Sequence, residues 1–458
     1  MTTANINRYI QYFTESFSQL EVDVPMMNIE RIAMSAHSAM ENKRRVYHSS
    51  KHVFDMCEGM NARQTLAALF HDMVYYQIDG GFPHNAGEIL SPVIHFEDAL
   101  ITLNPIDQNN LPVKLCAEVF AFEPGQNLNV FGGLNEFLSA IVAATLLAPL
   151  LKKADLLAVV VIIEATIPFR ETDESEQGFI ADLSTRIKKI CHDFNLFDSE
   201  ASINEYIHEV LIEAITLANR DVGGFAESNH GNFLSSTWEL IEESNAPLSA
   251  VSFYTIQDYR GSLLRMERFL SGLKANQIFH RYSNSPSKEK LSQMHLTAGK
   301  NIAFSCHYLS AKIAAIAIIE ALALETGGNC PVSMLLGDIN CDQGKPDRAE
   351  NFLPQIKNHP NLNLDLLYVL EGGRGQESKY DLTSSPLTAF VYRSLGDENM
   401  AMAFDHAKKM FNQEISCIAF LKSLNPELVS AIIEACSQIA ISRAPQLQAL
   451  TSTINSSH

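Results

Sequence analysis

Residues 47–76 read YHSSKHVFDMCEGMNARQTLAALFHDMVYY, and the rest of the chain is organised around this stretch. His48 and His52 are four residues apart, so on a helix their imidazoles would share one face. The adjacent pair His71-Asp72 follows an apolar run, at the end of a second predicted helix. Imidazole and carboxylate groups are ligands that proteins offer to Zn, Mn, Fe and Mg. The stretch therefore predicts two helices that bring a metal site together.

The pattern resembles the HD superfamily of metal-dependent phosphohydrolases, a helical fold named after its adjacent His-Asp pair. Tyr47-His48 followed by His52 resembles the start of the cyclic-nucleotide phosphodiesterase motif, and LFHDMVY resembles bacterial HD proteins of unassigned substrate. The resemblance is sharp over residues 45–76, weak as far as residue 242 and absent beyond. It implies the metal ligands His52, His71 and Asp72 and, as proton donor to the leaving oxygen, His48.

The resemblance also implies one more carboxylate ligand far downstream, usually on a helix that follows a threonine-containing segment. Thr166 in IEATIPFR stands where that threonine would fall. Asp221 in LANRDVGGF is then the expected last ligand, at a helix end next to glycines, where a side chain can approach a metal with little steric hindrance. Asp155 and Asp182 are the rivals for this position.

Two arginines are candidates for substrate binding. Arg170 stands where related proteins often have a polar or basic residue near the substrate, and guanidinium matches phosphate oxygens with two parallel hydrogen bonds. A surface salt bridge with Glu171 or Asp173 is the equal alternative for this residue. Arg220, beside Asp221, is the second candidate.

The reaction that the resemblance implies is hydrolysis of a phosphoester of a nucleotide or another small molecule. One or two divalent ions (Mn, Mg, Zn or Fe) would activate water, with Asp72 as a shared, catalytic ligand. An HD-type diiron oxygenase is an alternative, for which His84 and His95 would have to supply two further histidines. A ligand-binding signalling module that kept the fold without catalysis is the other alternative, and the intact motif argues against it.

Composition and charge limit the partners of the chain. Hydrophobic residues make up 46% of the 458 residues and charged residues only 19%, which provides material for a large buried core. The formal net charge is −19 and the pI about 5.2, so stable binding to long nucleic acid is not expected. A small phosphorylated substrate remains compatible with this charge, because a bound divalent ion reverses the local potential. Homo-oligomerisation is left open.

The sequence predicts a cytoplasmic protein. Its eight cysteines show no CxxC and no regular spacing, which is typical of reduced thiols. The N-terminal residues lack a basic region followed by an apolar run, so no signal peptide is expected. The apolar stretches 138–151 and 156–167 are too short for membrane spans and predict core helices.

Hydrophobic periodicity predicts an all-α protein. We expect an HD-type domain of helices over residues 1–282, a polar break at 282–293 and a mostly helical domain of unknown role over 294–458. Within the first domain, residues 5–20 predict an amphipathic helix, and residues 91–122 predict one helix and part of a second.

The glycine-rich turn at 372–375 is a further candidate for anion binding, because it contains Arg374. It lacks the Lys-Ser/Thr that follows a P-loop and matches no nucleotide fingerprint. An ordinary turn is the favoured interpretation.

Overall fold

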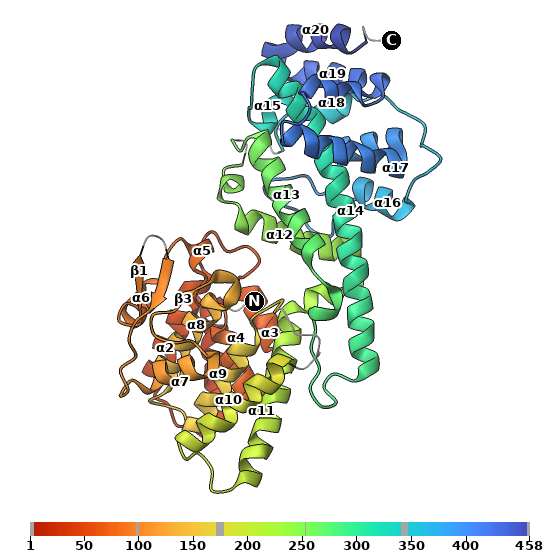
Figure 1. Ribbon diagram of the computed structural model, residues 1–458. Helices are drawn as coiled ribbons and strands as arrows, with labels where there is room; N and C mark the ends of the chain where they lie inside the picture. The colour runs from red at the N-terminus through yellow and green to blue at the C-terminus, as the bar shows by residue number, and fades with distance from the viewer. Residues whose placement is uncertain (1–3, 98–99, 171–177, 252, 340–346, 456–458) are drawn as a thin grey trace. The chain divides into compact units, whose positions relative to one another are not determined.

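The computed structural model describes residues 4–97, 100–170, 178–251, 253–339 and 347–455 (Figure 1). The contacts within the chain divide it into two units, unit 1 (Met1–Ala226 and Lys274–Ala298) and unit 2 (Glu227–Leu273 and Gly299–His458). Both units are helical, with only three short strands among the described residues. The all-α class predicted from the sequence is confirmed.

Unit 1 contains eleven α-helices and three strands in its described residues. The helices are α1 (Asn5–Gln19), α2 (Met26–Met40), α3 (Ser50–Cys57), α4 (Ala62–Phe70), α5 (Tyr76–Asp79), α6 (His84–Leu90), α7 (Leu111–Phe120), α8 (Leu134–Leu147), α9 (Lys153–Ala165), α10 (Gly178–Asp193) and α11 (Glu200–Asp221). The strands are β1 (Ile94–Glu97), β2 (Leu100–Leu103) and β3 (Asn127–Leu128).

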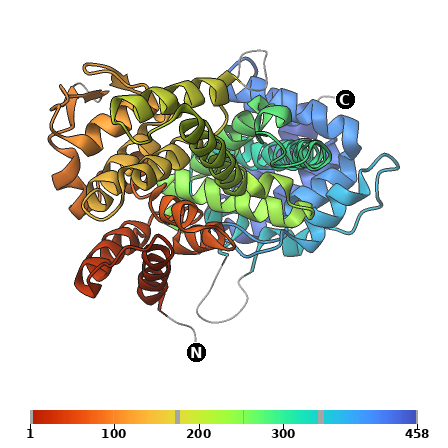
Figure 2. The same ribbon diagram turned by 90° about the horizontal axis from the view of Figure 1, so that it is seen from below.

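The core of unit 1 follows from helical periodicity. Tyr9, Phe13 and Phe17 of α1 recur every four residues and are buried, and α1 forms a helical hairpin with α2 (Figure 2). Helix α9 is apolar all round, as a helix buried on every side must be, and its residues 156–165 are all buried. It packs against α4, α8 and α11. Because α4 and α11 both end at the candidate metal ligands, this central helix fixes the two ends relative to each other.

The expected helix over the first part of residues 91–122 is wrong. The residues of β1 and β2 pair antiparallel instead, with Ile94 opposite Leu103, and β3 extends the sheet beside β2. Apolar runs of four residues do not distinguish a helical period from a strand period, and branched residues such as Ile101 and Thr102 favour strands. Helix α7 follows as expected.

Unit 2 contains α12, α13 and the helices that follow α14, while the boundary between the units falls within α14 itself. Trp238 of α12, the only tryptophan, is buried in it. The helices are α12 (His230–Ser244), α13 (Ile256–Gly272), α14 (Lys288–Thr326), α15 (Val332–Leu336), α16 (Leu364–Gly372), α17 (Pro386–Phe411), α18 (Cys417–Lys422), α19 (Pro426–Ile439) and α20 (Ala444–Asn455).

The division by contacts differs from the predicted domains 1–282 and 294–458. Residues 227–273, which form α12 and α13, belong to unit 2, although they precede the polar break in the chain. The break at 282–293 lies inside unit 1, where Tyr282 and Ser285 pair their backbones in a tight turn. The polar segment that we predicted to be a domain boundary is a turn within unit 1. Turns and linkers have the same polar composition, so the sequence does not distinguish them.

Helix α14 is the one helix among the described residues that is long and apolar enough to cross a membrane. Its apolar window is 72% buried inside the protein, which is the environment of a core helix. Of the two stretches that we expected to be core helices rather than spans, residues 138–147 form the C-terminal part of α8 and residues 156–165 form most of α9. The seven described cysteines are free thiols, and Cys341 lies outside the described residues.

Candidate metal centre

His52 is the third residue of α3, and His48 precedes the helix. Ser49 is the N-cap, with an extended backbone (φ −107°, ψ 172°), so the helix begins at Ser50. The expectation that both histidines lie on one helix is therefore wrong. The two imidazoles are neighbours all the same, with ring centroids 5.9 Å apart, because residues 46–49 form a bend.

Helix α4 carries the His-Asp pair at its C-terminal end. It starts with a capping box, in which the side chains of Asn61 and Gln64 each accept from the other's backbone N–H. His71 follows the last helical residue as C-cap, and its Nδ1 lies 2.9 Å from the carbonyl oxygen of Ala68. Since a carbonyl only accepts, Nδ1 carries a proton, which leaves Nε2 as the nitrogen that can bind a metal. The helix end thus presents Nε2 of His71 next to Asp72.

Asp221 is the last residue of α11, and the end of this helix is tied to α3. Arg220 donates from Nη1 to the carbonyl oxygen of Asp55 (3.3 Å) and from Nη2 to that of Glu58 (3.0 Å). These carbonyls lie at the C-terminal end of α3, which has no intrahelical donors for them. The guanidinium of Arg220, a candidate for substrate binding, is therefore engaged in holding α11 against α3, beside the ligand cluster.

Four side chains from these three helix segments converge. Oδ1 of Asp221 lies 3.1 Å from Nε2 of His52 and 3.6 Å from Nε2 of His71. Oδ2 of Asp72 lies 3.0 Å from Nε2 of His71 and 3.9 Å from Nε2 of His52. Donor atoms of His52, His71 and Asp72 all lie within 4.8 Å of one another. The structure brings together all four residues that the sequence had selected as ligands (Figure 1 shows α3, α4 and α11).

The donor set fits a divalent cation. Nε2 of His71 is buried and has no hydrogen-bond partner among the residues that the structure describes. It faces two carboxylates, so a positive charge between them satisfies all three groups at once. The side chain of His71 is 1% exposed and that of Asp221 is 17% exposed, so the cluster is closed on one side and reaches solvent on the other. Two imidazoles and two carboxylates suit Zn, Mn or Fe.

The pKa values of the cluster report the same electrostatic balance. Burial alone would lower the pKa of His71, yet the charges of Asp72 and Asp221 raise it well above its usual value. Burial would raise the pKa of Asp72, but the imidazoles of His71 and His48 hold it far below its usual range. The cluster therefore favours bound positive charge, and His48 lies close enough to act on Asp72.

Glu136 is a carboxylate near the cluster that the sequence did not reveal. It is the third residue of α8, and its Oε2 is buried and has no hydrogen-bond partner among the described residues. Burial, followed by the charges of Asp72 and Asp221, raises the pKa of Glu136 to about 7. The signal that was available is a single acidic residue in the apolar run LNEFLSAIVAATLL. Such a residue costs free energy in a core unless its charge is paired or neutralised there.

Arg45 fixes the backbone of the His-Asp pair by a hydrogen bond to Asp72. Its guanidinium is buried and pairs with Asp79 through two bonds, Nε to Oδ1 (2.9 Å) and Nη2 to Oδ2 (2.6 Å). Nη1 donates to the carbonyl oxygen of Asp72 at 2.6 Å. Arg45 is thus a positioning residue, and Asp79 is occupied by it.

Arg170 does not face the ligand cluster directly. Nη1 binds Oε1 of Glu164 at 2.9 Å, Nη2 binds the Glu164 carbonyl oxygen, and the guanidinium covers the ring of Phe179. Arg186 shares the same carboxylate at 3.1 Å. The salt bridge that we set against a substrate role is therefore formed, but with Glu164. The partners first considered, Glu171 and Asp173, lie outside the described residues.

The rival residues lie elsewhere. Oδ1 of Asp155 is 3.9 Å from Nη1 of Arg63, and Asp182 is exposed on α10. His95, one of the two histidines that a diiron oxygenase would need, is exposed on β1, and its Nδ1 lies 2.7 Å from Oδ1 of Asn104. The side chain of His84 lies outside the described part of the chain. Asp221 is thus the downstream carboxylate that geometry selects.

Comparisons with known proteins give no independent guide. No protein-family model, no curated protein and no solved structure matches this chain. The resemblance to the HD superfamily therefore rests on the motif residues alone.

Proposed function

We propose that the chain is a divalent-metal-dependent phosphohydrolase of the HD type. The observation that carries the proposal is the convergence of His52, His71, Asp72 and Asp221, which come from sequence positions up to 169 residues apart. Side chains at such separations do not meet through local preferences of the chain. A buried imidazole nitrogen that faces two carboxylates without a well-directed hydrogen bond to either is typical of a ligand set rather than of a packed core.

The four residues would hold the ion, and the hydrogen bonds that these residues make to other parts of the protein would fix their orientation. The hydrogen bond from Nδ1 of His71 to the Ala68 carbonyl fixes the ring and directs Nε2 inward, as outer contacts of metal-binding histidines usually do. A bound divalent ion supplies a water of lowered pKa and neutralises phosphoryl oxygens. Arg45 keeps Asp72 in place by donating a hydrogen bond to the backbone carbonyl oxygen of Asp72.

His48 is the candidate proton donor to the leaving oxygen. Its ring lies against Tyr75, with centroids 4.7 Å apart, and beside ligand His52, with centroids 5.9 Å apart. A histidine next to the ligands is placed to deliver a proton to a leaving oxygen as a general acid. Glu136, with a pKa of about 7, is a second group that can exchange a proton near neutrality.

The proposed substrate is a small phosphoester, such as a nucleotide. Arg170 and Arg220 both have intramolecular partners, so charge neutralisation of a phosphate falls to the ion and to His48. The net charge of −19 disfavours long nucleic acids as substrates.

The test is hydrolysis of a panel of nucleotides and generic phosphodiesters with Mn, Mg, Zn or Fe added, run on the wild type and on three variants. We expect Asp72→Ala to lose metal and activity together, and His48→Ala to retain metal but to slow turnover by about 10²–10⁴-fold, the usual contribution of a general acid. Asp182→Ala, an exposed carboxylate on α10, is the matched control and should behave as wild type.

Two outcomes would contradict the proposal. Protein that binds metal but hydrolyses no member of the panel would remove the phosphohydrolase assignment. Loss of metal from His48→Ala would make His48 a ligand and its role as proton donor wrong.

A further inference from the structure

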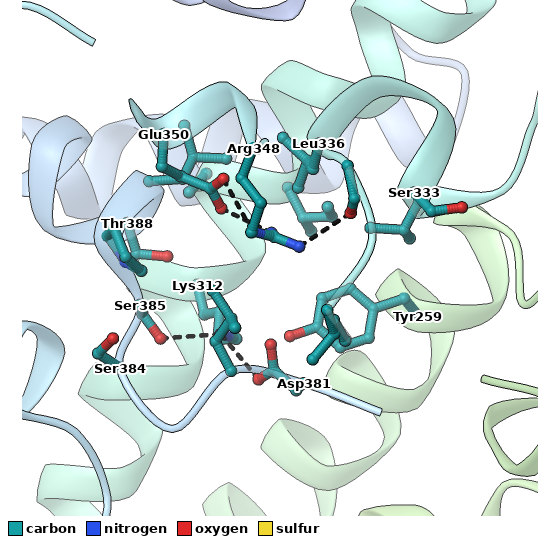
Figure 3. A pocket seen from close by; sticks show the side chains of 18 of the residues that line it. Tyr259, Lys312, Ser333, Leu336, Arg348, Glu350, Asp381, Ser384, Ser385 and Thr388 are labelled. Atoms are coloured by element: carbon teal, nitrogen blue, oxygen red, sulfur yellow. Dashed lines mark hydrogen bonds and ion pairs between the residues drawn. The ribbon is translucent and has the colours of Figure 1, made fainter. Parts of the chain in front are cut away.

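Unit 2 contains a cavity of about 60 Å³ that the metal site does not use (Figure 3). Its polar lining includes Tyr259 of α13, Lys312 of α14, and Asp381 and Ser385 from the segment that precedes α17. A water-sized group needs about 10–15 Å³ by this measure, so the space suits about four or five such groups. The cavity is small and built for a compact polar guest.

The buried charges beside the cavity do not balance. Lys312 and Arg374 are 6% and 4% exposed and share one carboxylate, that of Asp381. Oδ2 of Asp381 lies 2.9 Å from Nζ of Lys312 and 3.4 Å from Nη1 of Arg374, and it also accepts from Nε1 of Trp238 at 2.8 Å. Two buried cations against one anion leave a positive charge, which is costly away from water unless another anion is bound.

The other charged groups that line the cavity do not cancel this excess. Arg348 and Glu350 form a two-bond pair with each other, at 3.1 Å and 2.8 Å, and are neutral together. Asp338 is exposed, where its charge is screened by solvent. The uncompensated charge is therefore that of Lys312 and Arg374.

A chain of hydrogen bonds turns Ser385 into a donor toward the cavity. Nη1 of Arg374 donates to the hydroxyl oxygen of Tyr308 at 3.2 Å, and this hydroxyl lies 2.8 Å from Oγ of Ser385. Ser385 also accepts from Nζ of Lys312 at 2.8 Å. When the Tyr308 hydroxyl donates to Oγ of Ser385, both lone pairs of Oγ accept hydrogen bonds, and the O–H of Ser385 is left to donate to a guest.

The same arrangement leaves the N-terminus of α17 open. Ser385 is the N-cap residue, but its side chain makes no capping hydrogen bond. The backbone N–H groups of Leu387 and Thr388, both in the lining of the cavity, therefore lack the partner that an N-cap serine normally supplies. The positive end of a helix dipole and free N–H groups favour an anion.

Tyr259 adds an independent observation. Its hydroxyl is buried and has no hydrogen-bond partner among the described residues, and Figure 3 shows it pointing toward Asp381 and the space beside Lys312. Burial, together with the charge of Asp381, raises the pKa of Tyr259 well above its usual value, so the hydroxyl keeps its proton. The Tyr259 hydroxyl can therefore donate a hydrogen bond to a bound guest.

We propose that this cavity binds a phosphate group, either inorganic phosphate or the terminal phosphate of a small organic molecule. A phosphate has five non-hydrogen atoms, the size of the space, and several oxygens to accept from Lys312, Tyr259, Ser385 and the start of α17. The helical region of unknown role in unit 2 thus contains a site for the same chemical group that the metal site is proposed to release. The two sites share no residues.

The test is calorimetric titration of the full chain with sodium phosphate and, in parallel, with glycerol phosphate, in EDTA and a phosphate-free buffer so that the metal site cannot contribute. We expect saturable binding of at least one of the two. Tyr259→Phe keeps the ring and removes only the donor, and should weaken binding roughly tenfold or more, the effect of losing one hydrogen bond to a charged group. Lys312→Met should abolish it.

Tyr380→Phe is the matched control. It also removes a buried tyrosine hydroxyl, but one that donates to the Trp238 carbonyl at 3.1 Å and does not line the cavity, so its phosphate affinity should equal that of the wild type. Binding of inorganic phosphate alone would identify the free ion as the ligand, and tighter binding of the ester would identify an organic phosphate. Absence of saturable binding, or equal affinity in wild type and Tyr259→Phe, would overturn the proposal.

Discussion

Asp221→Ala is the change that tests the metal centre most directly. Asp221 supplies one of four donors, since its Oδ1 lies 3.1 Å from Nε2 of His52 and 3.6 Å from Nε2 of His71. Tight four-ligand sites in proteins contribute about 10–16 kcal/mol of binding free energy, or about 2.5–4 kcal/mol per ligand. Loss of about 3 kcal/mol corresponds to an affinity about 150-fold lower. The three remaining donors should still bind metal, but weakly.

The affinity is measured by competition with a metal-sensitive dye, at fixed pH because protons and metal compete for the same imidazoles. Asp155→Ala and Asp182→Ala serve as controls, because both residues were rivals for the fourth ligand and neither is in the cluster. Unchanged affinity in Asp221→Ala, together with reduced affinity in either control, would refute the assignment of the ligands. Folding of each variant is checked by its circular dichroism.

Two further predictions concern stability. Arg45→Met removes the buried partner of Asp79 and should lower the free energy of unfolding by about 3–5 kcal/mol, as measured by urea denaturation; a loss below 1 kcal/mol would show that the pair is not needed. Burial, helped by the charge of Arg170, lowers the pKa of His280 to about 4, so the folded protein holds this ring neutral while the unfolded chain binds a proton below pH 6.5. The contribution of His280 to the free energy of unfolding is therefore fully present above pH 6.5 and falls by about 3 kcal/mol as the pH drops to 4. His280→Gln should remove this part of the pH dependence of unfolding, and an unchanged dependence would contradict the reasoning.

The parts of the site that the sequence predicted are those with a local or a motif signal. The apolar run before His71 marks a buried helix, and the pair at its end had to lie where that helix stops. The resemblance supplied the rest, because the helix end and the glycines after Asp221 are only a weak local signal against Asp155 and Asp182. That these residues bind a metal stays a prediction.

The features that the sequence did not reveal depend on partners that are distant in the chain. Arg220 finds its carbonyl acceptors 165 and 162 residues away, and Arg45 finds Asp79 34 residues away. The sequence alone therefore does not show that these guanidinium groups are already paired within the fold. The start of α3 was missed for a local reason, since Ser49 and Ser50 are both good N-cap residues and only the backbone decides between them.

The chain passes between the two units three times, after residues 226, 273 and 298, and this limits what its fragments can do. A fragment that stops at residue 226 would lack His280, whose backbone N–H and carbonyl are both bonded to the side chain of Asn219, two residues from Asp221. A fragment that starts at residue 299 would lack α12 and α13, and with them Tyr259. A fragment of residues 1–298 contains all of unit 1 and a fragment of residues 227–458 contains all of unit 2, but each also carries a part of the other unit, so no single cut separates the two units cleanly.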